Sequence, residues 1–145
     1  MAKRLTLQID RPCFKDILNG VQDVEHRFIY PSNAKQYVIQ HDDDSIQCVQ
    51  YDELYLINGR RKDAPRLTVL VENAEFVLFT DEDGNGIIDT TEKGEEYLVS
   101  QVWSHLGKVT STENVPDDFY YDSDTKKERL RLYQEGAAEI EQNML

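Results

Sequence analysis

Short runs of alternating apolar and polar residues recur along most of the chain, and this period of two is typical of half-buried β-strands. The first run, residues 4–9, precedes residues 10–20, whose apolar side chains recur at helical spacing. Asp10 is expected to cap that helix. Gly20 is expected to end it, because glycine accepts the left-handed conformation past a helix end. The pattern therefore predicts a strand followed by a short amphipathic helix.

Further strands are predicted from the same alternation and from β-branched and aromatic residues. They cover residues 24–30, 37–40, 53–57, 66–71, 74–80 and 97–103. Residues 106–109 continue or close the last of these strands, and residues 46–49 are ambiguous. Residues 81–94 form a polar connection. The chain is thus rich in short strands and has little room for helices between them.

The last part of the chain has a different character. Residues 113–124 are acidic and poor in aliphatic side chains, as a connection is. Thr125 and Glu128 match a capping box at the start of a predicted helix over residues 125–145. One stripe of that helix carries Leu130, Tyr133, Ala137 and Ile140. We expect a domain over residues 1–112, followed by an acidic connection and C-terminal helix over residues 113–145.

These elements define a fold class. Six or seven short strands with a single helix between them argue against an alternating parallel α/β arrangement. We predict an α+β, mostly β fold. It is a small, mostly antiparallel β-barrel of about six strands with an early helix and a C-terminal helix.

Composition and charge narrow the classes of function. The 145 residues include 16 Lys or Arg and 28 Asp or Glu, a net charge of −12, and residues 71–145 account for all of the excess acid. Such a surface repels a phosphate backbone, so non-specific binding of duplex DNA is not expected. The apolar runs of about five residues are too short to cross a bilayer. The N-terminus has no apolar signal-peptide core, and the two cysteines are too few for a disulfide framework. We therefore expect a cytoplasmic protein with no membrane partner.

One segment resembles a known family. Residues 14–27 read as a helix end followed by a strand, and they resemble the signature of the ASCH domain family. In that family Gly-x-Lys-x-x-Glu-x-Arg follows the helix, and three of its positions match Gly20, Glu25 and Arg27. Residues 55–59 and 66–71 look like the family's central strand pair. The resemblance implies a PUA-like β-barrel, a fold that handles RNA or modified bases.

The resemblance implies binding rather than catalysis. In the amidohydrolase branch of the family, which resembles a deacetylase of modified cytidine, a Lys and a Thr take part in the chemistry. These positions fall on Gln22 and Glu25 here. Glutamine has no titratable amine and cannot act as a base or nucleophile. A hydrolase of an acylated nucleoside therefore stands only as an alternative.

The expected ligand is RNA or a nucleoside- or nucleotide-like molecule in a polar cleft. Glu25 and Arg27 are two residues apart on a strand, so both project from one face. Arg offers a planar fork to a phosphate or base edge, and Glu accepts from base amino groups. The same two side chains also fit a structural ion pair. The predicted ligand-binding residues are Gln22, Glu25, Arg27, Arg60 and Arg61.

Two further features leave alternatives open. Residues 81–92 match the EF-hand loop pattern at the ligand positions Asp81, Asp83, Asn85, Asp89 and Glu92. The residues before this loop are β-like, so it is either a calcium site or a hairpin connection whose Asp, Asn and Gly residues form turns. No other cofactor is expected. The acidic second half also suits a module that binds a basic protein partner.

Overall fold

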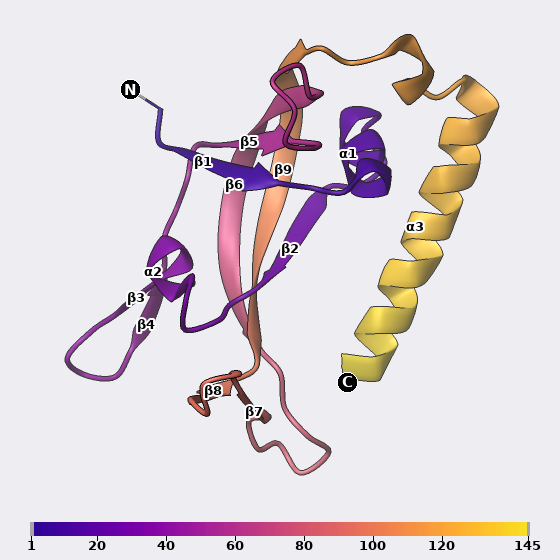
Figure 1. Cartoon of the computed structure of the whole chain (residues 1–145). Helices are drawn as coiled ribbons and strands as arrows, with labels where there is room; N and C mark the ends of the chain where they lie inside the picture. Colours follow the sequence, from indigo (N-terminus) through magenta and orange to yellow (C-terminus); the bar gives the residue numbers. More distant parts are fainter. Residues whose placement is uncertain (1, 145) are drawn as a thin grey trace. The chain divides into compact units, whose positions relative to one another are not determined.

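The structure, a computed structural model, describes the backbone of residues 2–144 and the side chains of residues 2–136. Figure 1 labels the elements in chain order. They are β1 (Arg4–Gln8), α1 (Arg11–Leu18), β2 (Val24–Phe28), α2 (Ala34–Tyr37), β3 (Val38–Gln40), β4 (Ile46–Cys48), β5 (Glu53–Ile57), β6 (Arg66–Leu78), β7 (Ile88–Thr90), β8 (Glu96–Leu98), β9 (Ser100–Glu113), the 3-10 helix η1 (Asp117–Phe119) and α3 (Ser123–Met144). The predicted mostly β fold with an early and a C-terminal helix is confirmed. None of the helices in the described residues is long and apolar enough to cross a membrane.

The chain divides into two compact units, each drawn from separate stretches of sequence. Unit 1 comprises residues 1–23, 53–70 and 107–145, and unit 2 comprises residues 24–52 and 71–106. The long strands β6 and β9 contribute residues to both units. The largest sheet has the strand order β1-β5-β6-β9-β2.

The core of unit 1 follows from the alternation in its strands. β5 pairs with β1 in parallel register and with β6 in antiparallel register. Leu54 and Leu56 of β5 are fully buried, and the residues between and beside them are half-buried. Phe14 and Ile17 of α1 are buried as well. Each such side chain contributes about 1.5–3 kcal/mol on burial, so these positions hold the unit together.

Helix α1 begins and ends where the sequence predicts. The Asp10 side chain accepts a hydrogen bond of 2.9 Å from the Cys13 backbone N–H, which caps the helix. Pro12 lies in the first turn, where its missing N–H has no partner to lose. Gly20 follows the last turn with a φ of +73°, which a residue with a side chain adopts only at a cost.

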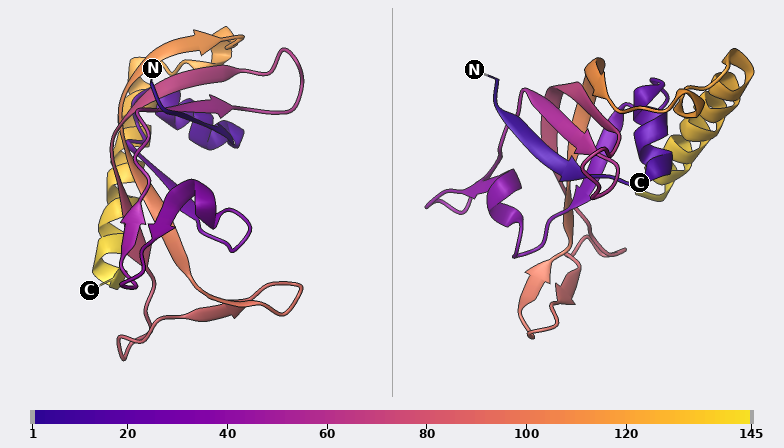
Figure 2. Two further views of the ribbon diagram at one scale, coloured as in Figure 1. Left: turned by 90° about the vertical axis from the view of Figure 1, so that its left-hand side faces the viewer. Right: turned by 45° about the horizontal axis from the view of Figure 1, so that its top comes forward.

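Helix α3 lies against α1, as Figures 1 and 2 show. The Asp16 carboxylate of α1 accepts hydrogen bonds from the Arg129 Nη2 at 2.6 Å and from the Tyr121 hydroxyl at 2.7 Å. The predicted stripe has two half-buried members, Leu130 and Tyr133, and two outside the described side chains, Ala137 and Ile140. Both sides of the domain boundary expected at residue 112 fall in unit 1, and that boundary stays a prediction.

The predicted capping box at the start of α3 is wrong. The helix begins at Ser123, because the Asp122 side chain accepts the Thr125 backbone N–H at 2.7 Å. Glu128 lies instead 2.5 Å from the Arg131 guanidinium. Asp122 and Thr125 are both good caps. Asp122 caps the helix, because its carboxylate accepts a backbone N–H of the first turn that has no partner within the helix.

Unit 2 is built from β2, three short hairpin strands and parts of β6 and β9. β2 pairs with β9, β3 with β4 and β7 with β8, all in antiparallel register. Its buried hydrophobic residues are Ile29, Tyr37, Ala74, Val102 and Leu106. One acidic residue, Glu25 of β2, is buried among them at 5% exposure.

Three strand predictions need correction. The runs over residues 66–71 and 74–80 form the single strand β6, which passes through the exposed Glu72 and Asn73. Polar residues that face solvent do not interrupt a strand, because the hydrogen bonds between strands are made by the backbone. The connection predicted over residues 81–94 contains β7, and the run over residues 97–103 divides into β8 and β9. The ambiguous run at residues 46–49 contains strand β4.

Candidate functional site

The two central residues of the predicted cleft contact each other on β2. The Arg27 Nε donates a hydrogen bond to the Glu25 Oε1, and the two side chains are 28% and 6% exposed. Burial raises the pKa of the nearby Tyr37, while the Arg27 guanidinium opposes that shift and the Glu25 carboxylate adds to it. Glu25, Arg27 and Tyr37 therefore form one polar cluster in unit 2. A buried carboxylate held by a guanidinium is what a structural ion pair requires.

The next residue along β2 contacts an aromatic side chain of β9. The His26 ring meets the Trp103 ring edge-on, with 4.8 Å between their centroids. Burial lowers the pKa of His26, and the neighbouring His105 lowers it further. The His26 side chain is exposed, and its ring contact with Trp103 accounts for its position on β2. We assign it no role in binding.

The five predicted ligand-binding residues fall in different units. Glu25 and Arg27 belong to unit 2, whereas Gln22, Arg60 and Arg61 belong to unit 1. Gln22 is half-buried, and its backbone N–H donates to the Asp16 carbonyl at 3.1 Å. Arg60 and Arg61 lie in the exposed loop after β5. The structure brings Glu25 and Arg27 into contact with each other.

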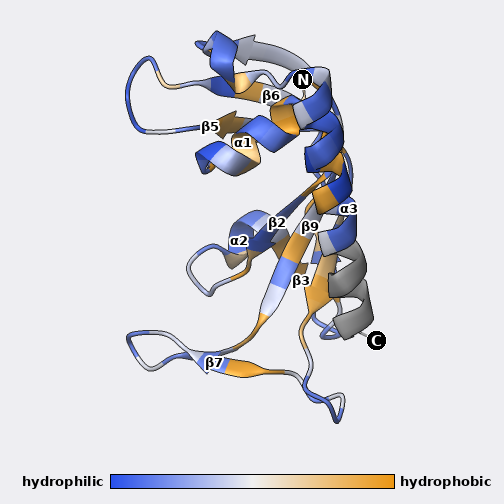
Figure 3. Ribbon diagram, turned by 90° about the vertical axis from the view of Figure 1, so that its right-hand side faces the viewer, coloured by the Kyte–Doolittle hydropathy of each residue, from blue (hydrophilic) through white to orange (hydrophobic). Residues whose placement is uncertain are grey.

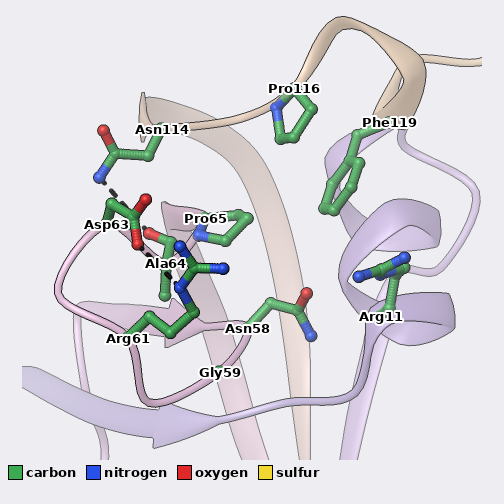
Figure 4. A pocket seen from close by; sticks show the side chains of 10 residues that line it. All are labelled: Arg11, Asn58, Gly59, Arg61, Asp63, Ala64, Pro65, Asn114, Pro116 and Phe119. Carbon is green, nitrogen blue, oxygen red and sulfur yellow. Dashed lines mark hydrogen bonds and ion pairs between the residues drawn. The ribbon is translucent and has the colours of Figure 1, made fainter.

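Unit 1 contains a pocket that includes one of the predicted residues, Arg61 (Figure 4). Its volume is about 420 Å³, within the range of small-ligand sites. Arg61 reaches in from the loop after β5, and Arg11 reaches in from α1 on the opposite side. The lining residues are Arg11, Asn58, Gly59, Arg61, Asp63, Ala64, Pro65, Asn114, Pro116 and Phe119. Arg60 is not among these described residues.

Local hydrogen bonds fix the two amide side chains of the pocket. The Asn58 Nδ2 donates to the Ile9 carbonyl at 2.9 Å, which orients its Oδ1 toward the space between the two arginines (Figure 4). The Asn58 backbone N–H donates to the Pro65 carbonyl at 2.9 Å and closes the loop at its base. The Asn114 Nδ2 lies 3.5 Å from the Ala64 carbonyl. The pocket thus offers amide groups in set positions beside two cationic side chains.

The two arginines of the pocket differ in their partners. Arg61 lies 3.3 Å from Asp63, and the side chains are 86% and 71% exposed. An ion pair at that exposure is worth about 0–1 kcal/mol, so Arg61 can exchange Asp63 for another anion. The Arg11 guanidinium lies 5.6 Å from the centre of the Phe119 ring. Among the described residues, Arg11 has no carboxylate within 4.0 Å.

The net charge differs sharply between the units. Unit 1 holds 13 basic and 14 acidic residues, for a net charge of −1. Unit 2 holds 3 basic and 14 acidic residues, for a net charge of −11. Of the net charge of −12 in residues 71–145, residues 71–106 of unit 2 carry −8 and residues 107–145 of unit 1 carry −4. The pocket of unit 1 can attract an anion locally, whereas the surface of unit 2 repels one.

The EF-hand-like loop forms a tight turn followed by a hairpin. The Asp81 Oδ1 accepts backbone N–H groups of Asp83 and Asn85, each at 2.9 Å. Asp89 lies on β7, and Glu92 lies in the turn that precedes β8. The described residues include no group of three or more His, Cys, Asp or Glu side chains arranged to hold a metal ion. The hairpin is observed, and the calcium site stays a prediction.

Sequence reasoning missed most of the residues of the pocket. Arg11 reads as a helix residue, Asn58 as a turn signal, and Phe119 as the first of three successive aromatic residues in an acidic connection. These positions come together only through the pairing of β1 with β5 and the packing of Phe119 on Phe14, whose ring centroids are 5.8 Å apart. No family model, curated protein or solved structure matches the chain.

Proposed function

We propose that the chain is a PUA-like module of the ASCH type that binds a nucleotide-like ligand, either a free nucleotide or a nucleotide of single-stranded RNA. The pocket of unit 1 carries this proposal, because it combines two arginines with two oriented amides in about 420 Å³. The match of Gly20, Glu25 and Arg27 to the family signature supports the same class of ligand. The parallel β1–β5 pair with α1 following β1 is compatible with the proposed fold.

The phosphate is the part of the ligand that the arginines recognise. A guanidinium presents a planar fork of donors that matches phosphate oxygens, and two forks on opposite walls place the phosphate between them. Arg61 gives up its exposed contact with Asp63, and Arg11 already points into the pocket. Asn58 and Asn114 then lie beside the sugar and base, where an amide can both donate and accept.

Binding rather than hydrolysis is the activity that the residues support. Gln22 stands where the amidohydrolase branch has its lysine. The titratable side chains that line the pocket are Arg11, Arg61 and the exposed Asp63. Arginine keeps its proton at neutral pH and cannot act as a general base. We therefore assign the pocket to recognition.

The test is a two-dimensional amide NMR titration of the full chain with cytidine 5′-monophosphate, cytidine, inorganic phosphate and an oligouridine of six nucleotides. We expect saturable shifts for residues 58–64 and for Asn114, with the monophosphate binding more tightly than cytidine. Shifts confined to β2 around Glu25 and Arg27 would move the ligand to that cluster and away from the pocket. An unchanged spectrum with every ligand would refute the proposed function.

A matched pair of variants separates recognition from general charge. Arg60→Gln and Arg61→Gln remove the same charge from neighbouring positions of one exposed loop, and only Arg61 lines the pocket. We expect Arg61→Gln to weaken monophosphate binding about tenfold, which corresponds to about 1.4 kcal/mol. Arg60→Gln should change it less than twofold. Equal losses in the two variants would show that the loop attracts anions without forming a site.

A further inference from the structure

Four aromatic rings form a row in unit 2. Phe28 stacks on Phe79 with 6.2 Å between centroids, and it lies 6.2 Å from Tyr30. Tyr30 meets Tyr97 edge-on at 6.0 Å. Phe28 and Tyr30 are 46% and 43% exposed. Contiguous apolar surface of this kind marks an interaction site more often than chance exposure does.

The β7–β8 hairpin adds to the exposed apolar surface of unit 2. Ile88 and Leu98 are register partners on β7 and β8, and both side chains are exposed. In Figure 3, part of β7 is coloured as hydrophobic and the rest as hydrophilic. A two-stranded hairpin is marginally stable without a covered face, so exposing two large aliphatic side chains on it has a cost. A partner that covers this hairpin would offset that cost.

A groove of about 700 Å³ begins at the end of the aromatic row. Tyr30, Pro31 and Ser32, which follow β2, form one wall. The other wall is the turn of the β7–β8 hairpin. Its lining residues are Thr90, Thr91, Glu92, Lys93, Glu95 and Tyr97. That turn is closed by two backbone hydrogen bonds of 2.9 Å between Thr91 and the residues that follow it. The groove therefore has an aromatic end at Tyr30 and Tyr97 and a polar turn beyond it.

Charge gives the groove a preference for a cation. Residues 81–96 contain seven acidic side chains and one basic side chain, a net charge of −6 within a unit of net charge −11. Glu92 and Glu95 line the groove, and Lys93 is its one basic lining residue. A polyanion is repelled by such a surface, and a basic segment is attracted to it.

We propose that this groove and the aromatic row bind an arginine-rich segment of a partner protein. Guanidinium planes stack on the exposed faces of Tyr30 and Tyr97, and their charge is balanced by Glu92 and Glu95. The aliphatic stems of the same side chains cover Phe28. Arginine fits better than lysine, because its planar group stacks on a ring while it binds a carboxylate.

The test uses two labelled peptides of equal length and charge, (Arg-Gly)5 and (Lys-Gly)5, with the full chain and fluorescence anisotropy. We expect the arginine peptide to bind at least threefold more tightly, with amide NMR shifts at Tyr30, at Ser32 and at residues 90–97. Equal affinities with shifts spread over the acidic loops would overturn the proposal, because only net charge would then be recognised. Association of the chain with itself through the same residues, seen by sedimentation at rising concentration, would also overturn it.

Four variants separate the rings from the charge. Tyr97→Ser removes one ring without changing the net charge, and we expect it to weaken arginine-peptide binding at least fivefold. Lys93→Gln removes the opposing charge and is expected to strengthen binding about twofold. Glu95→Gln removes one negative charge from the groove. Asp42→Asn removes the same charge from the β3–β4 loop, outside the groove, and should weaken binding less than twofold. If Asp42→Asn weakened binding as much as Glu95→Gln, the groove would not be the site.

Discussion

The Asp16 carboxylate is the main polar anchor between α1 and α3, and removing its charge should loosen α3. Its side chain is 10% exposed and accepts three hydrogen bonds. The donors are the Tyr121 hydroxyl at 2.7 Å and the Arg129 Nε and Nη2 at 3.1 and 2.6 Å. Asp16→Asn keeps the size of the side chain but removes the charge and one acceptor.

The size of the expected loss of stability follows from the burial of Asp16 and Arg129. Hydrogen bonds to a charged group contribute about 1.5–3 kcal/mol each when buried. The Arg129 side chain is 41% exposed, so its bidentate pair with Asp16 is screened by water and is worth less, about 1 kcal/mol. Adding the bond from Tyr121, we expect Asp16→Asn to lower the free energy of opening of α3 by about 2 kcal/mol. This corresponds to about 30-fold faster amide exchange, since 1.4 kcal/mol is tenfold.

Native-state hydrogen exchange of the full chain is the suitable assay, because it reports α3 separately from the strands. The amides of residues 127–134 should exchange faster in Asp16→Asn, and those of Leu54 and Leu56 should change little. Arg131→Gln is the control, because the partners of Arg131 among the described residues are the exposed Glu128 and Glu135 of its own helix. In a double-mutant cycle, Asp16→Asn and Arg129→Gln should be less than additive. Additive effects, or unchanged exchange of α3 in Asp16→Asn, would refute the contact.

Four further substitutions or treatments have predicted signs. Gly20→Ala should destabilise unit 1 by about 1 kcal/mol in urea unfolding, because φ is +73° there, whereas Gly136→Ala in α3 should stabilise the helix by a similar amount. The pKa of His26 lies below its ordinary value of 6.5, so the folded state binds fewer protons and stability is lost as the pH falls through 6.5. That loss should be smaller in His26→Phe. Burial and the nearby Glu75 raise the pKa of Cys48, so its thiol should react slowly with a disulfide reagent at pH 7 and faster in urea.

The parts of the fold that local chemistry determines are predictable from the sequence. Asp10, Pro12 and Gly20 are the cap, first-turn and end signals of α1, and each acts within a few residues of its own position. The alternation in residues 53–57 defines β5 with the observed bounds. A contact within one element, such as the pair of Glu25 with Arg27, follows from strand geometry in the same way.

Features that depend on distant residues are not predictable in this way. The start of α3 could fall at either of two good caps, Asp122 or Thr125, and no pattern decides between them. Asp16 reads as a solvent-facing helix residue until Arg129, 113 positions away, is seen to pair with it. The pocket needs the pairing of β1 with β5 before Arg11 and Arg61 line the same cavity. The signal for such a site lies in tertiary packing.

The central claim, that the pocket of unit 1 recognises a nucleotide phosphate, is tested most directly by calorimetry. Cytidine 5′-monophosphate is titrated into the full chain, into Arg60→Gln and into the double variant Arg11→Gln/Arg61→Gln. We predict saturable binding to the unmodified chain and to Arg60→Gln with the same affinity within twofold, and a loss of at least tenfold in the double variant. Binding of equal affinity in all three proteins would contradict the claim and place the ligand outside the pocket.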